Sequence, residues 1–205
     1  MLFRSVAINA AEEESLEALK KWWEENGKQL LTMVIVVFAL GTSWLLWQNS
    51  QIAAADAASD IYEEILTLAV AEPGTEVSAE NGAQILDLGN QLRADHSGTV
   101  YALFGSLFSA QQQVRTDDLA AAEESLQWIL DNQKDGMFDK TDEGLILTAS
   151  LRLGRVILAQ GDAERALSLI NNLDPKTFEP GFAELRGDVY LAMGRLVDAR
   201  EAYQA

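Results

Sequence analysis

The chain has 205 residues, a formal net charge of −17 at pH 7 and no cysteine. The missing thiols exclude a disulfide framework, cysteine catalysis and thiolate ligation of a metal, and the acidity disfavours nucleic acid as a partner. Three prolines, few β-branched runs and many Ala, Leu, Glu and Gln residues disfavour an all-β domain. The composition therefore predicts an all-α protein.

The N-terminal segment, residues 1–29, contains a candidate amphipathic helix over residues 11–27. Leu16, Leu19, Trp22 and Trp23 recur there at helical spacing, and acidic residues occupy much of the remainder. Two alternatives stay open for this helix. It is either a solvated tail or a helix that binds the membrane surface or a partner.

Residues 30–47 form an uncharged apolar run that predicts a transmembrane helix. Eighteen helical residues at about 1.5 Å each span roughly 27 Å, close to the hydrocarbon thickness of a bilayer. Trp22 and Trp23 precede the run, and Trp44 and Trp47 stand at its end, which suits the two membrane interfaces. The alternative, a buried helix of a soluble domain, does not account for tryptophans at both ends.

The basic residues near the run predict its orientation. Arg4, Lys20, Lys21 and Lys28 precede it, and no Lys or Arg follows until Arg93. Because basic residues are retained on the cytoplasmic side, the N-terminus is expected in the cytoplasm. Residues 48–205, with 26 acidic and 11 basic residues and a net charge of −15, are then expected in the periplasm of a bacterial cell, anchored in the inner membrane.

A cleavable signal peptide is the rival interpretation of the apolar run. Ala53 and Ala55 have the spacing of small residues that signal peptidase reads. The segment before the run is, however, long and rich in glutamate, whereas a signal peptide has a short basic region and a shorter apolar core. The sequence therefore favours an uncleaved signal anchor.

The exported part is predicted to consist of short helices joined by tight turns. A breaker, Pro73-Gly74, follows the first of them, and a polar loop over residues 133–141 precedes the C-terminal third. The helices expected before that loop cover residues 52–71, 78–94, 99–114 and 119–130.

The C-terminal third repeats with a period of 33 residues. Small residues at this period let two helices approach closely, as in a tetratricopeptide repeat (TPR), so the fold expected for residues 48–205 is a TPR-like solenoid of helical hairpins. The last repeat is expected to be incomplete, because the sequence stops within its second helix. The repeat-defining pairs are Gly154 with Gly187, Gly161 with Gly194, and Ala166 with Ala199.

An upstream repeat is expected around Ala110, Asp118 and Ala122. It departs from the TPR pattern at Ser109 and Gln113, and about ten additional residues separate it from the next repeat. Its register is therefore open.

The whole layout resembles the YfgM family, the ancillary subunit of the SecYEG translocon. The resemblance rests on the run KKWWEENGK before the apolar segment, on Tyr101-Ala102-Leu103, on LRLGRV from Leu151, and on Asp188 after Leu185-Arg186-Gly187. It implies a membrane-anchored periplasmic TPR-like protein that lies beside SecYEG and links it to periplasmic chaperones. The alternative is a TPR scaffold of another envelope machine, for cytochrome maturation or outer-membrane assembly.

Catalytic and cofactor-binding patterns are absent from the sequence, so neither an enzyme, a cofactor nor a small-molecule substrate is expected. His96 is the one histidine and has no second His or Cys with which to bind a transition metal. Function is expected on protein-binding surfaces instead. Gly41 and Ser43 are candidates for a contact within the membrane, and the candidate groove residues are Phe104, Leu107, Leu151, Arg155, Glu184 and Asp188.

Overall fold

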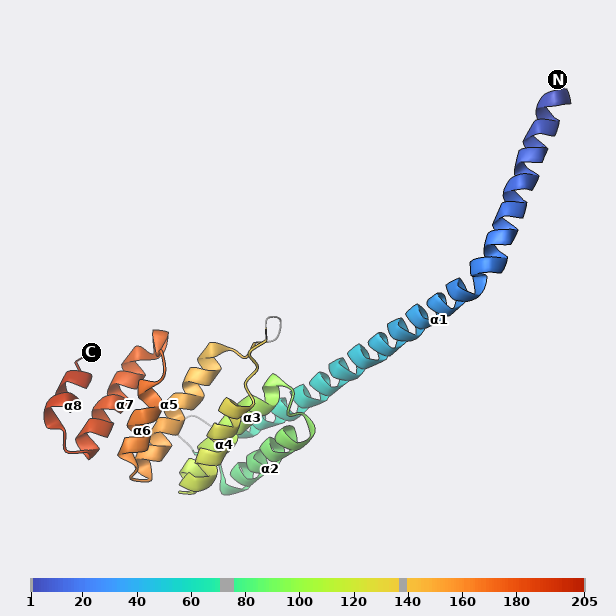
Figure 1. Ribbon diagram of the computed structural model, residues 1–205. Helices are drawn as coiled ribbons and strands as arrows, with labels where there is room; N and C mark the ends of the chain where they lie inside the picture. Colours follow the sequence, from blue (N-terminus) through green and yellow to red (C-terminus); the bar gives the residue numbers. More distant parts are fainter. Residues whose placement is uncertain (1, 71–75, 137–139, 205) are drawn as a thin grey trace. The chain divides into compact units, whose positions relative to one another are not determined.

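The computed structural model describes residues 2–70, 76–136 and 140–204, with side chains from Ser15 onward (Figure 1). These residues form helices joined by short turns and contain no strand, only one isolated bridge between Asp135 and Lys140. The predicted all-α class is confirmed. The elements are α1 (Leu2–Ala69), α2 (Ala79–Asp95), α3 (Val100–Arg115), α4 (Leu119–Asp131), α5 (Glu143–Ala159), α6 (Ala163–Asn171), the 3-10 helix η1 (Lys176–Phe178), α7 (Glu179–Ala192) and α8 (Leu196–Ala202).

From α2 to α4 the observed helices follow the predicted ranges to within one or two residues, whereas α1 joins the segments predicted over residues 11–27, 30–47 and 52–71 in one continuous helix. Side chains at their starts explain several boundaries, since Ser78, Thr99, Asp118, Asp142 and Asp162 each accept a hydrogen bond from a backbone N–H of the first turn. The breaker Pro73-Gly74 and part of the loop 133–141 lie outside the described residues. Contacts divide the chain into two units, Met1–Ala53 and Ala54–Ala205.

The first unit is helical, and its apolar side chains are uncovered. Within the described chain one helix, Ser15–Ala69, is long and apolar enough to cross a membrane, with a mean hydropathy of 2.1 in its most apolar window and none of that window buried. Phe38 and Leu46 are 71% and 72% exposed. A water-soluble helix buries such side chains, so this helix has the character of a membrane span.

The second unit begins with the end of α1, which packs with α2 and α3. Ile65, Ile85 and Leu92 are fully buried there. Two glycines that the sequence did not single out bring α2 against α3: a Cβ on Gly89 would lie 2.1 Å from Ser109 Oγ, and one on Gly105 would lie 2.7 Å from Leu92 Cδ1. Only glycine fits such an approach.

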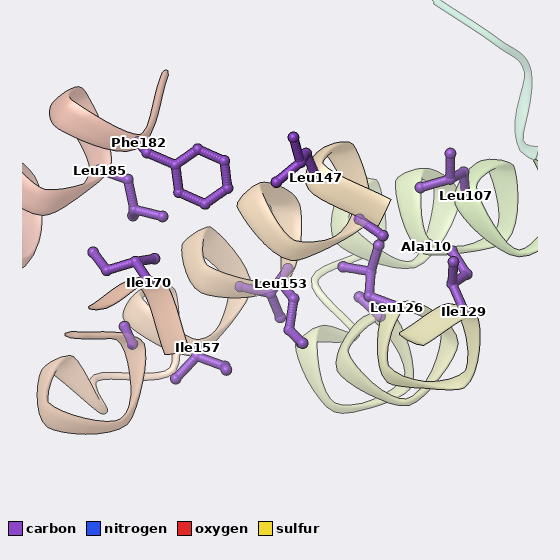
Figure 2. Packing of buried hydrophobic residues seen from close by; sticks show 14 of the residues in the cluster. Leu107, Ala110, Leu126, Ile129, Leu147, Leu153, Ile157, Ile170, Phe182 and Leu185 are labelled. Carbon is purple, nitrogen blue, oxygen red and sulfur yellow. The ribbon is translucent and has the colours of Figure 1, made fainter. Parts of the chain in front are cut away.

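A larger core joins α3 to α7. Figure 2 shows side chains of this core from Leu107 and Ala110 at one end to Phe182 and Leu185 at the other. Trp128 on α4 packs against both this core and the one formed by α1, α2 and α3. The second unit is therefore a stack in which each hairpin is covered by the next, as a solenoid requires.

Three hairpins share one turn geometry. Gly161 and Gly194 have positive φ angles of 90° and 73°, and Asp117 occupies the same place with a φ of 61°. In each turn the following N–H donates to a carbonyl five residues earlier, as from Asp118 to Gln113 and from Asp162 to Ile157. This common turn settles the register of the upstream repeat: α3 and α4 form a hairpin equivalent to α5–α6 and α7–α8.

Substitutions at Gly161 test this turn. Gly161→Val is expected to lower the free energy of unfolding by about 1–2 kcal/mol, because a side chain disfavours a positive φ. Gly161→Asp is expected to cost less, since Asp117 adopts the same conformation and aspartate tolerates it. Urea unfolding of the full chain in detergent micelles, followed by circular dichroism, measures both. Gly98→Val is the control, because a Cβ at Gly98 meets no atom within 4 Å; equal losses at both glycines would contradict the assignment.

Candidate protein-binding groove

A groove of about 390 Å³ lies over α3, α4 and α5. The two hairpins meet here, so side chains from the end of α3 face side chains from the second half of α5. This volume is within the range of pockets that hold small ligands or a few side chains of a partner. The lining residues are Ala110, Gln111, Val114, Arg115, Leu119, Leu126, Arg152, Arg155, Val156 and Ala159.

The floor of the groove is apolar and continuous with the main core. Leu126 and Val156 are almost fully buried beneath it, whereas Val114 is 44% exposed. The exposed part of Val114 is apolar surface that a partner side chain could cover, which favours binding. The floor is therefore an apolar surface, called here the apolar seat, on which a side chain of a partner can pack.

Three arginines surround this seat. Arg115 forms an ion pair with Glu76 at 3.2 Å, and Arg155 forms one with Glu184 at 3.0 Å. Arg152 has no ion pair with any residue that the structure describes. The lining set contains no acidic residue. Because Glu76 and Glu184 pair with two of the three arginines from outside the lining, one arginine charge, that of Arg152, is left unpaired among the described residues, on a domain whose net charge is −15.

Of the predicted groove residues, Arg155 is the one found in the lining. Arg155 lines the groove, and its partner Glu184 lies across the gap between α5 and α7. Leu151, on the same helix as Arg155, is half-buried against Gly181, where a Cβ would lie 2.9 Å from Leu151 Cδ2. Leu151 therefore contributes to helix packing.

The other predicted groove residues lie elsewhere. Leu107 is only 8% exposed and belongs to the core. Phe104 is half-buried, with its ring centroid 5.8 Å from that of Tyr62. Asp188 accepts a hydrogen bond of 2.6 Å from the Tyr203 hydroxyl, and this bond holds the pKa of Tyr203 above its ordinary value. None of these three residues belongs to the lining of the groove.

Sequence reasoning missed Arg115 and Arg152. The repeat register gives no signal for them, because Arg115 and Arg152 stand at different places relative to the turns at Asp117 and Gly161. α3 can be placed against α5 only when the register of the upstream repeat is known, and the sequence alone does not give that register. The groove therefore became visible only with the hairpin stack.

Four of the six small residues of the 33-residue period lie at close helix contacts, and the other two, Gly161 and Gly194, lie in the turns. A Cβ on Gly154 would lie 2.7 Å from Leu185 Cδ2, and one on Gly187 would lie 2.2 Å from Tyr203 Cε1. Ala166 is fully buried, and Ala199 is 3% exposed. These positions hold neighbouring helices of the last two hairpins together.

Comparisons with known proteins agree with this architecture. A family model described as a tetratricopeptide repeat-like domain matches residues 20–205. Three relatives bear the name ancillary SecYEG translocon subunit: one from Haemophilus influenzae is 30% identical over 203 residues, covering 97% of this chain and 90% of its own length. One from Escherichia coli is 32% identical over 196 residues, covering 95% and 86%. One from Neisseria gonorrhoeae is 26% identical over 200 residues, covering 97% and 88%.

The chain belongs to the family of ancillary SecYEG translocon subunits. The family resemblance predicted from the sequence is thereby confirmed, and so is the TPR-like fold. No solved structure matches the chain. The ancillary-subunit family is named for association with a membrane channel, which fits a long apolar helix followed by a repeat domain.

The tryptophans predicted to lie at the membrane interfaces are exposed on α1. Trp44 and Trp47 lie with ring centroids 5.2 Å apart, and Trp22 is 47% exposed. Trp23 covers Gly27, where a Cβ would lie 3.1 Å from the indole ring. The ring planes of Trp44 and Trp47 are tilted by 43°. Tryptophans at the ends of an apolar run are typical of the bilayer interface.

Gly41 and Ser43, the candidates for a contact within the membrane, are both exposed. A Cβ built on Gly41 meets no atom within 4 Å. The helix backbone is therefore open to close approach by another helix at Gly41, as small residues allow in membranes.

Clusters suited to metal chemistry are not found among the residues that the structure describes. No group of three or more His, Cys, Asp or Glu side chains is placed to hold a metal ion there. His96 ends α2, where its backbone N–H donates to the Leu92 carbonyl.

Proposed function

We propose that this chain is a non-enzymatic, single-pass protein of the bacterial inner membrane, with a cytoplasmic N-terminus and a periplasmic TPR-like domain. The observation that carries the proposal is the uncovered apolar surface of α1, whose residues at the centre of the run are exposed on every face. The basic residues that precede the run, including Lys20, Lys21 and Lys28, support the orientation. The helix serves as an uncleaved anchor.

The anchored domain acts as an ancillary subunit of SecYEG and links the channel to a periplasmic chaperone that receives emerging chains. The names of its relatives support the association with SecYEG, and the exposed groove over α3, α4 and α5 supports a protein-binding role. Tethering beside the channel raises the effective concentration of the groove to the millimolar range, so that a weak contact suffices.

Affinity purification of the tagged full chain from detergent-solubilised membranes tests this function. We expect SecYEG and a periplasmic chaperone in the eluate. Absence of SecYEG from the eluate would contradict the proposed association. Recovery of components of cytochrome maturation or outer-membrane assembly in its place would support the alternative, a TPR scaffold of a different envelope machine.

The intramembrane contact is tested at Gly41. Gly41→Leu is expected to reduce the SecYEG recovered several-fold, because the larger side chain keeps a neighbouring helix away from the backbone. Ala39→Leu is the matched control, since two residues along a helix place it about 200° around the axis, on the opposite face. Quantitative immunoblotting of the SecYEG subunits measures both. Equal recovery of SecYEG with the two variants would show that Gly41 is not the site of the contact.

A further inference from the structure

The charge of the groove is opposite to that of the domain that carries it. Three of its ten lining residues are arginines and none is acidic, whereas residues 48–205 have a net charge of −15. A basic hollow on an acidic surface is not explained by solubility, for which scattered acidic residues suffice. The groove therefore has the electrostatic character of a site for a negatively charged group.

Arg152 and Arg155 are available to a partner, whereas the side chain of Arg115 is 28% exposed and also donates a hydrogen bond to the Val77 carbonyl. Arg152 has no ion pair within the described part of the chain and is exposed. Arg155 and Glu184 are 48% and 62% exposed in their side chains, and Glu76, which pairs with Arg115, is 93% exposed. Ion pairs between exposed side chains contribute only about 0–1 kcal/mol, so a second carboxylate can displace them at little cost.

The geometry of the rim favours carboxylates. A guanidinium group presents planar, paired N–H donors that match the two oxygens of a carboxylate. Arg152 and Arg155 lie on one helix at a spacing of three residues, which places their side chains on the same face, while Arg115 approaches from the facing helix. Apolar side chains, among them Val114 and Val156, lie within the same lining. The groove thus combines an apolar seat with carboxylate-binding groups around it.

We propose that this groove binds an extended acidic segment of a partner protein, with an apolar side chain on the floor and flanking Asp or Glu side chains paired to Arg152 and Arg155. The proposal rests on the proposed function and names the chemistry of the partner that the periplasmic domain receives. An extended segment suits a narrow groove between helices, because successive side chains can reach the floor and the rim.

A protein segment fits this groove better than an anionic membrane surface. The remaining surface of the domain is acidic and repels a flat anionic surface, and the arginines lie around a hollow. Repulsion between the acidic domain and an acidic peptide is screened beyond about 8 Å at physiological ionic strength, whereas the contacts within the groove are shorter. The local arginines therefore dominate once the segment is seated.

Peptide binding to the full chain in non-ionic detergent micelles tests the proposal. The probe is a fluorescein-labelled, C-terminally amidated peptide of Glu and Ser residues with one central Leu, and its binding is followed by fluorescence anisotropy. We expect saturable binding that Arg152→Gln weakens about tenfold, the equivalent of one charge-assisted contact. Arg200→Gln, which removes the same charge from exposed α8, is expected to leave the affinity unchanged.

Arg152 is a safe position for this test because it has no ion pair with a described residue, so its loss does not break a contact within the fold. A peptide with Gln in place of Glu separates charge from apolar contact. Equal binding of the Gln peptide, or equal affinities of the wild type and Arg152→Gln, would overturn the proposal. Arg152-dependent binding to phosphatidylglycerol vesicles without peptide binding would also overturn it and assign the arginines to a membrane surface.

The failure of this inference is distinguishable from failure of the proposed function. Loss of peptide binding together with normal recovery of SecYEG would overturn the acidic-segment proposal alone. Absence of SecYEG from the eluate, together with Arg152-dependent peptide binding, would overturn the proposed function and support the groove assignment. Both readouts use the same tagged, full-length protein.

Discussion

Replacing Phe182 by alanine is expected to lower the free energy of unfolding of the last hairpin by about 3–5 kcal/mol, the usual cost of removing a buried phenylalanine. Phe182 is 0% exposed and lies at the start of α7. Figure 2 shows its ring between the α7 ribbon and the α5 ribbon that carries Leu147. The substitution leaves a cavity at the contact that holds α7 to the preceding hairpin.

The loss is expected to be local. In a repeat stack each hairpin contacts mainly its neighbours, so stability is the sum of hairpin and interface contributions. Loss of the α5–α7 contact therefore weakens α7 and α8 while α3 and α4 keep their own core around Leu126 and Ile129. Hydrogen exchange of the full-length protein in micelles, read peptide by peptide, measures this difference.

Leu191→Ala is the matched control on the same helix. Leu191 is 53% exposed, so its truncation is expected to change stability by no more than about 0.5 kcal/mol. Unchanged protection of α7 and α8 in Phe182→Ala would contradict the assigned packing. Equal loss of protection in every helix from α2 to α8 would instead show that the stack unfolds as a single cooperative unit.

The hairpins were predictable because local chemistry defines them. Gly161 and Gly194 supply the positive φ of the turn, and Asp162 accepts the hydrogen bond that starts α6. The same turn at Asp117 was harder to recognise, since aspartate tolerates a positive φ but does not signal it. Its register became clear only from the shared backbone hydrogen bonds.

The core contacts and the groove were less accessible to sequence reasoning, because they depend on how hairpins stack. Neither Phe182 nor Gly89 is one of the repeat-defining residues, so the 33-residue pattern does not predict the contacts that they make. Arg152 acquires its neighbours only when α5 lies against α3. A periodic pattern predicts which residues share a helix face, whereas pairing between helices far apart in sequence is a property of the packed domain.

The anchor is tested by two charges within the apolar run. Val36→Arg combined with Phe38→Arg is expected to abolish stable membrane insertion, because each arginine at the centre of a span costs about 2.5–3.5 kcal/mol on the insertion scale. The two positions lie about 200° apart around α1, so no single rotation of the helix can shield both from lipid. Carbonate extraction followed by immunoblotting measures the membrane-embedded fraction.

A control variant with the same added charge outside the apolar run shows whether a loss of membrane insertion is due to the position of the arginines or to positive charge in general. Ala57→Arg with Thr67→Arg places two arginines on exposed sites of the same helix beyond the apolar run, and this variant is expected to stay carbonate-resistant. If the Val36 and Phe38 variant also resisted extraction, α1 would not be the membrane span, and the exposed apolar surface of residues 30–47 would need a protein partner to cover it.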